Sequence, residues 1–244
     1  MTRDTPVRTF TSATCDDVGV DQHVVMKAPL FSALDDPKAE RLMGSMTPRR
    51  LSRGEVVFRE GDPGDSLYVI VTGKIKLART SADGRENLLS VLGPGEMFGE
   101  LSLFDPGPRL STAYVVSNTE LVSLGNDALR IFLGDHPEVA MQMLAGLAHR
   151  LRRTNEGISD LVFTDVPGRV AKALLDLSTR FGEPADDGLR VAHDLTQEEL
   201  AQLVGASRET VNKALADFAS RGWMRVDSRA VTILDADRLA RRAR

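Results

Sequence analysis

The sequence predicts an α+β protein with a β-rich N-terminal domain, one long helix and a small C-terminal helical domain. Short β-rich runs separated by turn signals fill residues 47–124, which is typical of a sandwich or barrel. Residues 137–163 have no proline after the first position and place apolar residues at alternating steps of three and four. Residues 164–244 combine a helix-turn-helix pattern with a β-hairpin.

The overall composition indicates a soluble, globular chain. Its 244 residues suffice for two modest domains with cores of their own. The net charge of -4 gives no sign of a nucleic-acid partner, so any basic surface has to be local. A single cysteine, Cys15, cannot form an internal disulfide, which favours a reducing, cytoplasmic location. No apolar run reaches the roughly 18 residues that a membrane span needs, and no signal peptide is predicted.

The first folded domain is predicted over residues 24–136. Residues 1–23, rich in Thr, Asp and Ser, are expected to form a mobile extension. Residues 23–46 predict short helices, with Asp36 as an N-cap and Pro37 in the first helical position. The predicted strands are EVVF, SLYVIV, KIKLART, NLLSVL, STAYVV and ELVSL, with a hairpin turn at Asp83-Gly84. A short helix over 126–136 closes the domain.

One segment of this domain, FGELSLFDPGPR (98–109), has the composition of an anion site. A glycine permits close backbone approach to a ligand, and an arginine can bind a phosphate through two parallel hydrogen bonds. The segment is not a P-loop, because no Gly-Lys-Ser/Thr follows. It is not a dinucleotide fingerprint either, because the glycines of LGPGEMFGE have the wrong spacing.

Residues 137–163 predict a dimerisation helix with an apolar seam. A polar break at Thr154, followed by Asn155, interrupts this seam. The break either sets the register of two helices or receives a polar ligand between two chains, and spacing alone leaves both open. Arg150, Arg152 and Arg153 are most simply a solvated basic face. The seam positions are Leu144, Leu147, Leu151, Ile158 and Leu161.

The C-terminal domain is predicted over residues 164–244, after a hinge at Asp165–Gly168. A helix over 169–180, a polar loop over 182–188 and a short strand over 190–193 precede the helix-turn-helix. Thr196 and Glu199 form a capping box, Gly205-Ala206 makes the turn, and Ser207 caps the second helix. WMRVDSRAVTIL then predicts a hairpin wing. The alternative is an ordinary helical hairpin, but the early second helix carries polar residues suited to groove contacts: Arg208, Glu209, Asn212 and Lys213.

These motifs, in this order, resemble one known family. GELSLFDPGPR resembles the phosphate-binding cassette of cyclic-nucleotide-binding domains. Barrel, cassette, long helix and small helical domain together resemble the bacterial cyclic-AMP receptor proteins of the CRP/FNR family. GRENLL, DVPGRVAKALL and LTQEELAQLVGASRETVNKALADF resemble the actinobacterial members. The resemblance covers residues from about 24 to the C-terminus and implies a jelly-roll barrel, a dimerisation helix and a winged helix-turn-helix.

The resemblance also implies a ligand site for cyclic AMP as an allosteric ligand. Glu100 would accept a hydrogen bond from the ribose, Gly99 would allow close approach, and Arg109 would pair with the cyclic phosphate. The family commonly has Ser or Thr after this arginine, and this chain has Leu110, so one phosphate contact is in doubt. Thr154 and Asn155 match seam residues that meet the adenine, which favours ligand docking at the polar break. Leu101 and Ser111 complete the predicted site.

By the same resemblance the second domain would bind a palindromic operator with half-sites like TGTGA. Arg208 would bind a guanine, Glu209 a cytosine, and Lys213 a further guanine or a phosphate. Thr196 and Ser207 would hold phosphates. The alternative role for Glu209 is an i,i+4 surface pair with Lys213. Gln197 and Thr210 complete the predicted DNA-binding set.

The predicted function is therefore a homodimeric, cyclic-AMP-responsive transcriptional regulator whose partners are double-stranded DNA and RNA polymerase. Catalysis is not expected, because HExxH, GxSxG and Walker motifs are absent, and no catalytic or metal-binding residue is assigned. Two alternatives remain. The chain responds to another ligand or binds DNA constitutively, or it is a nucleotide-binding module that acts on a protein partner.

Overall fold

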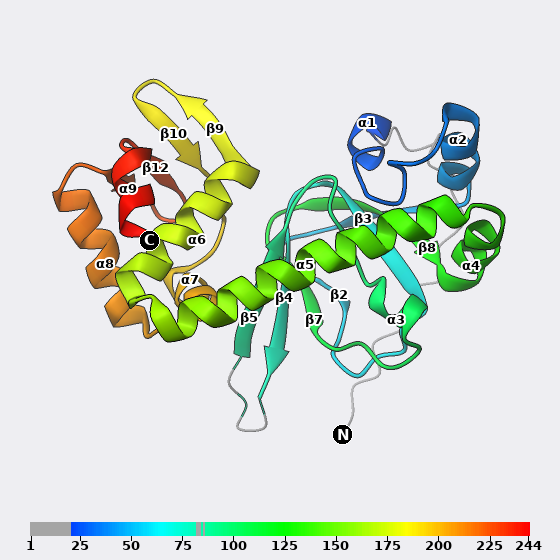
Figure 1. Cartoon of the computed structure of the whole chain (residues 1–244), viewed down its shortest axis with the longest axis horizontal. Coiled ribbons are helices and arrows are strands. Elements are labelled where there is room, and N and C mark those ends of the chain that lie inside the picture. The colour runs from blue at the N-terminus through cyan, green and yellow to red at the C-terminus, as the bar shows by residue number, and fades with distance from the viewer. Residues whose placement is uncertain (1–20, 82–83, 85) are drawn as a thin grey trace.

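The computed structural model describes residues 21–81, 84 and 86–244 (Figure 1). The predicted N-terminal extension, except for its last three residues, and Asp83 of the predicted hairpin turn lie outside the described residues. Within the described part of the chain, no helix combines the length and apolar character that crossing a bilayer requires.

The chain begins with two short helices, α1 (Gln22–Val25) and α2 (Asp36–Gly44). The predicted N-cap of α2 is wrong by one residue. Asp35 caps the helix, because its carboxylate accepts a hydrogen bond from the Lys38 amide at 3.1 Å. Asp36 therefore becomes the first helical residue and Pro37 the second, where proline still costs no hydrogen bond.

The β-rich domain is a sandwich of two four-stranded antiparallel sheets, ordered β1-β8-β3-β6 and β2-β7-β4-β5. All the predicted strands form, and two others were not predicted. One is the two-residue β6; the other is β1, whose Pro48 is tolerated because β1 lies at a sheet edge. The strands are β1 (Thr47–Leu51), β2 (Val56–Phe58), β3 (Ser66–Thr72), β4 (Ile75–Thr80), β5 (Glu86–Leu92), β6 (Met97–Phe98), β7 (Thr112–Val115) and β8 (Thr119–Gly125).

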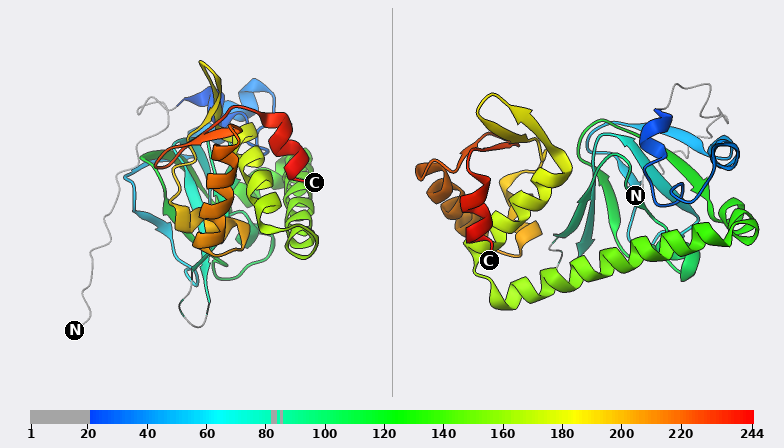
Figure 2. Two further views of the ribbon diagram at one scale, coloured as in Figure 1. Left: turned by 90° about the vertical axis from the view of Figure 1, so that its left-hand side faces the viewer. Right: turned by 45° about the horizontal axis from the view of Figure 1, so that its top comes forward.

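The helix α4 (Asn126–Asp135) leads into the long helix α5 (Pro137–Phe163), as predicted. Figure 2 shows α5 running beside the sandwich and on to the C-terminal domain. Its first turns belong to the core, since Val139 and Met143 are fully buried among side chains of α2, β3 and β8. The rest of α5 has no buried residue in this chain.

The C-terminal domain contains the predicted helix-turn-helix and wing. One expectation is corrected. Residues 182–185 of the predicted polar loop form strand β9, which pairs with β10, and β10 overlaps the predicted strand over 190–193. The sheet continues through the wing strands in the order β11-β12-β10-β9, and a further helix, α9, packs on α6. The elements are α6 (Val166–Phe181), β9 (Gly182–Ala185), β10 (Gly188–Val191), α7 (Gln197–Val204), α8 (Arg208–Ser220), β11 (Met224–Val226), β12 (Val231–Ile233) and α9 (Ala236–Arg242).

The two domains touch along β4, β5 and α7. Leu88, Val91 and Val116 of the sandwich form a buried cluster with Leu195, just before α7. Ion pairs flank this cluster, Lys74 with Asp194 at 2.5 Å and Lys76 with Glu199 at 2.8 Å. Burial disfavours the charged ammonium of Lys76, but its bonds to Glu199 and Glu86 outweigh that cost and raise its pKa.

Candidate ligand cassette and nucleic-acid interface

The backbone of the cassette turns at Gly99, between β6 and the short helix α3 (Leu101–Phe104). Gly99 has a φ of +83°, which a side chain rarely tolerates. A Cβ at this position would lie 2.9 Å from a terminal nitrogen of Arg109 and 3.0 Å from the Ser66 carbonyl oxygen. Gly99 thus lets the arginine lie directly against the main chain.

Arg109 is almost completely buried within the cassette, only 5% exposed. Its two terminal nitrogens donate to the carbonyl oxygens of Gly99 at 2.8 Å and Ser66 at 2.7 Å. Its guanidinium also lies 4.3 Å from the ring centre of Phe58. These contacts fix the side chain before any ligand arrives.

Glu100 is buried as well, at 1% exposure, and pairs with the long helix. Its Oε1 accepts a hydrogen bond from Arg150 at 2.7 Å, and Arg150 also donates to the Met97 carbonyl at 2.8 Å. Arg150 is 43% exposed, as a solvated face implies, but its guanidinium also binds the cassette, which the prediction did not include. Its position in an apparent surface run hid this role, because only the tertiary packing brings α5 against the cassette.

Two polar atoms at the cassette lack partners, although they are buried. The second oxygen of Glu100, Oε2, accepts no hydrogen bond, and Nε of Arg109 donates none. Each such group costs about 1–3 kcal/mol when left unpaired. The site therefore offers one acceptor for a hydroxyl and one cationic donor for an anion.

The other predicted cassette residues lie at its surface. Leu101 begins α3 and is about half exposed, Leu110 is 62% exposed, and Ser111 is partly buried. Thr154 and Asn155 are exposed on α5, one turn beyond Arg150. The Thr154 hydroxyl donates to the Arg150 carbonyl at 3.1 Å, and no described bond joins Thr154 or Asn155 to the cassette. Within one chain, then, the polar seam residues do not complete this site.

The seam of α5 is open to solvent in the single chain. Leu147 is partly buried, and the other predicted seam leucines and isoleucine are exposed by about half. The apolar surface extends to the end of the helix through Val162 and Phe163. Such a stripe on a helix of 27 residues matches the surface that a second copy covers.

The helix-turn-helix is built as predicted. Thr196 and Glu199 form a complete capping box at α7, with the Thr196 amide donating to Glu199 at 2.7 Å. Gly205 adopts the left-handed conformation at φ +63° and ends α7. Ser207 caps α8 by accepting from the Thr210 amide at 3.2 Å.

The N-terminal end of α8 faces solvent. Ser207, Arg208, Glu209 and Thr210 are exposed, as is Gln197 at the start of α7. A hollow of about 450 Å³ opens between the two helices. No described ion pair joins Glu209 to Lys213, so the alternative surface pair does not form here. The hollow is lined by Glu198, Ser207, Arg208, Glu209 and Asn212.

Arg169, which the sequence analysis did not single out, stabilises the helix-turn-helix through hydrogen bonds to main-chain atoms. Arg169 of α6 donates to the carbonyl oxygens of Val204 at 2.9 Å and Gly205 at 3.1 Å, which end α7. Its third bond, at 2.8 Å, goes to the Thr164 carbonyl between α5 and α6. No local pattern marks such a residue, because its partners are main-chain atoms and two of them lie about 35 residues along the sequence.

Two family models match this chain. A model described as a cyclic nucleotide-binding domain matches residues 48–136, and one described as a Crp-like helix-turn-helix domain matches residues 168–242. The chain is 56% identical over 221 residues to a CRP-like cAMP-activated global transcriptional regulator of Mycobacterium tuberculosis, covering 91% of this chain and 99% of that protein. It is 36% identical to a cyclic AMP receptor protein of Thermus thermophilus, over 86% of this chain and 94% of that one.

Solved structures with the same architecture include the c-di-GMP-responsive global regulator CLP of Xanthomonas campestris. That structure has a TM-score of 0.69 and 29% sequence identity, and covers 82% of this chain and 99% of CLP. FixK2 from Bradyrhizobium japonicum has a TM-score of 0.72 over 80% of this chain and 96% of that one; at 23% identity it shows the shared fold alone.

Proposed function

The chain belongs to the CRP/FNR family of transcriptional regulators, and we propose that it is a homodimer whose binding to operator DNA is controlled by cyclic AMP. This chain carries both a cyclic-nucleotide-binding domain and a Crp-like helix-turn-helix domain. The ligand acts by binding two arrangements of the dimer with different affinities, since a ligand without such a difference shifts nothing.

The observation that carries the ligand assignment is the pair of buried, unpartnered atoms at the cassette. Arg109 would present its Nε to the cyclic phosphate, and the Glu100 Oε2 would accept a hydrogen bond from the ribose hydroxyl. Cyclic AMP carries these two groups on two fused rings, the ribose and the cyclic phosphate, so it presents a hydroxyl and an anion at a fixed separation. Gly99, Leu101, Leu110 and Ser111 supply the walls and main-chain groups around the phosphate.

The exposed seam of α5 supports a dimer as the binding unit. Pairing two seams would cover the exposed leucines and bring Thr154 and Asn155 of a second copy towards the first chain's cassette, where they would meet the adenine. Burial of apolar surface stabilises by about 25 cal/mol per Å², so covering this seam favours the dimer.

The exposed end of α8 supports DNA binding in the major groove. Arg208 would bind guanine, Glu209 would accept from the amino group of cytosine, and Lys213 would bind a further guanine or phosphate. Thr196, Gln197, Ser207 and Thr210 lie at the two helix starts, where main-chain amides suit phosphates. In a dimer the two α8 helices would read half-sites like TGTGA about one turn of DNA apart. RNA polymerase is the partner expected at a promoter.

One observation favours a second candidate, a family member that responds to a different ligand. Leu110 is exposed beside Arg109 and offers no hydroxyl to a phosphate oxygen. CLP, which shares this fold at 29% identity, is c-di-GMP-responsive, so the family is not confined to one ligand.

Calorimetry separates these candidates. Cyclic AMP, cyclic GMP and c-di-GMP are titrated into the protein, with and without a palindromic TGTGA operator duplex. We expect cyclic AMP to bind most tightly and its affinity to rise with the operator present. Tighter binding of either other nucleotide would favour the second candidate. Binding of a nucleotide without any effect of DNA would instead point to a module that acts on a protein partner.

A further inference from the structure

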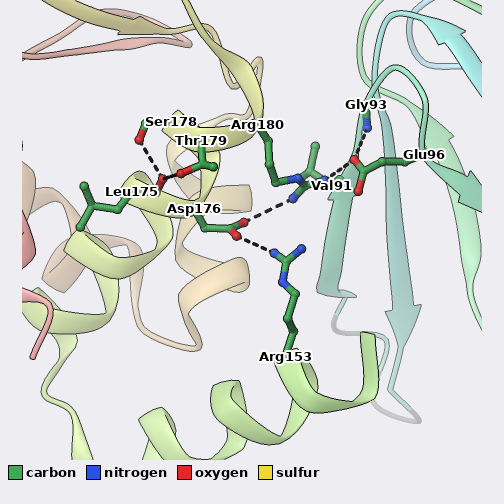
Figure 3. A network of polar contacts seen from close by, with 9 residues as sticks. All are labelled: Val91, Gly93, Glu96, Arg153, Leu175, Asp176, Ser178, Thr179 and Arg180. Carbon is green, nitrogen blue, oxygen red and sulfur yellow. Dashed lines mark hydrogen bonds and ion pairs between the residues drawn. The ribbon is translucent and has the colours of Figure 1, made fainter. Parts of the chain in front are cut away.

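We propose that Arg180, at the end of α6, is a positioning residue that couples the DNA-binding domain to the ligand cassette. The proposal rests on the proposed function, because it concerns how ligand occupancy reaches the helix-turn-helix. Arg180 touches neither the predicted ligand residues nor the predicted DNA-binding residues. Its partners belong to both domains, as Figure 3 shows.

The first arm of the contact joins Arg180 to the turn that leads into the cassette. One terminal nitrogen of its guanidinium donates to the Val91 carbonyl and to Glu96, the latter at 2.5 Å. Glu96 also accepts from the Gly93 amide at 2.8 Å, so it holds the turn between β5 and β6. The Arg180 side chain is only 17% exposed, and this shields the ion pair from solvent.

The second arm joins the same residue to the long helix. The other terminal nitrogen of Arg180 donates to Asp176, one turn earlier on α6, at 3.3 Å. The second carboxylate oxygen of Asp176 accepts from Arg153 of α5 at 2.6 Å. Asp176 therefore lies between two arginines and ties α5 to α6 (Figure 3).

Both arms end beside residues assigned to the ligand. Glu96 is followed immediately by Met97, whose carbonyl binds Arg150, and Glu100 is three residues beyond that. Arg153 precedes Thr154 on α5 and lies one turn from Arg150, the partner of Glu100. A ligand that takes up the free atom of Glu100 must act on the Glu100–Arg150 pair. Any shift of α5, or of the turn between β5 and β6, is then transmitted to Arg180 through its hydrogen bonds and ion pairs.

Close packing beside Arg180 also holds the end of α6 against the sandwich. The neighbouring Phe181 ring lies so close to Gly93 that a Cβ on the glycine would come within 2.3 Å of it. Phe181 also packs against the buried cluster of Leu88, Val91, Val116 and Leu195 between the domains. The end of α6 thus packs closely against the turn between β5 and β6, and Arg180 hydrogen-bonds to the same segment.

The test measures coupling rather than affinity alone. Cyclic AMP is titrated by calorimetry into wild-type protein, Arg180→Ala and Arg180→Lys, each with and without operator duplex. Coupling is reciprocal, so the operator must change the affinity for cyclic AMP by the factor by which cyclic AMP changes the affinity for operator. We expect Arg180→Ala to reduce this factor at least fivefold and to keep cyclic-AMP affinity without DNA within about twofold. Arg180→Lys keeps the charge but loses the planar fork, so an intermediate factor is expected.

Arg79→Ala serves as the matched control, because Arg79 also pairs with a glutamate, Glu60 at 3.1 Å, but entirely within the sandwich. Its coupling factor should equal that of the wild type. A double variant with Glu96→Gln should couple no more weakly than Arg180→Ala alone, if both act through one contact. A wild-type coupling factor in a folded Arg180→Ala protein would overturn the proposal. If the wild type itself neither binds cyclic AMP nor shows coupling, the proposed function fails instead.

Discussion

The ligand cassette and the start of the recognition helix α8 both depend on arginine and glutamate, but they hold these residues differently. At the cassette, Glu100 and Arg109 are almost fully buried and bound to protein atoms, with one polar atom of each left unpaired. On α8, Arg208 and Glu209 are exposed and make no described ion pair. The cassette side chains are therefore held in place before a ligand binds, whereas the exposed side chains of α8 are free to change conformation when DNA binds.

The two sites therefore differ in their effect on the stability of the free protein. Burial of an incompletely paired arginine and glutamate lowers stability, and a small ligand that completes the pairing recovers that free energy. A long duplex brings many phosphates and base edges, so flexible exposed side chains suffice there. Changes at the cassette should therefore affect both stability and binding, whereas changes on α8 should affect binding alone.

Arg109→Ala should have the largest effect. Loss of the phosphate contact should weaken cyclic-AMP binding by about 1.5–3 kcal/mol, and loss of the bonds to Gly99 and Ser66 should lower the free energy of unfolding by about 1–3 kcal/mol. Calorimetry and chemical denaturation measure the two losses. Arg59→Ala, which removes an exposed arginine of the same domain, should change neither. Unchanged nucleotide affinity in Arg109→Ala would remove the main ligand assignment.

A comparable effect is expected from pH at the boundary between the two domains. His193 is buried there, and this burial lowers its pKa from 6.5 to about 4. Below about pH 6.5, His193 is protonated in the unfolded chain, whereas in the folded chain it stays neutral down to about pH 4. The free energy of unfolding should therefore fall as pH drops through this window, by roughly 3 kcal/mol at most.

Urea denaturation between pH 7 and 4 measures this dependence. His193→Gln should flatten the slope, because no titrating group remains at the position. His149→Gln, at an exposed position on α5, should keep the wild-type slope. An unchanged slope in His193→Gln would show that His193 does not bind protons differently in the two states.

Glu209→Ala tests the exposed side of the comparison. If Glu209 binds cytosine, the variant should lose discrimination at that one base pair by about 1–3 kcal/mol. The salt dependence of binding and the stability of the fold should stay nearly unchanged, because no phosphate contact or buried partner is lost. Binding to a panel of operator variants gives the measurement, with Glu198→Ala from the same hollow as the control. Equal weakening on every operator would exclude the base-reading role.

Leu110→Ser should have the smallest effect. A hydroxyl at this exposed position would restore one hydrogen bond to the phosphate, worth about 0.5–1.5 kcal/mol, so cyclic AMP should bind about threefold to tenfold more tightly. Leu89→Ser, at an exposed leucine on β5, should leave the affinity as it is. If Leu110→Ser binds cyclic AMP no better than the wild type, the pocket is adapted to leucine and the second ligand candidate gains support.

The sequence predicted most of the fold because its signals are local. Alternation, turn residues and caps identify the strands of the sandwich, the long helix and the helix-turn-helix with its capping box at Thr196. β1 was missed because Pro48 argues against a strand, and only its edge position makes the proline harmless. A loop was predicted where β9 forms because Gly182, Pro184 and Gly188 are turn residues, whereas the predicted strand over 190–193 overlaps β10.

The candidate sites were predictable only in part. Gly99, Glu100 and Arg109 stand in one segment, so their chemistry was visible in the sequence. Arg150 and Arg180 were not visible as contacts, because each acts through partners more than forty residues away. A basic residue on a helix surface has the same local appearance whether it is solvated or joined to another domain. The roles of Thr154 and Asn155 depend on a second chain and stay predictions.

The junction between α5 and α6 has few degrees of freedom. Only Thr164 and Asp165 separate the two helices, which leaves about four soft backbone angles for any reorientation of the DNA-binding domain. Arg169 holds the Thr164 carbonyl, and the Asp165 carboxylate is bound by the Gly168 amide and by Arg242 of α9. Any reorientation of the domain therefore has to break these identifiable bonds and form others, which favours a few discrete positions over a continuous range.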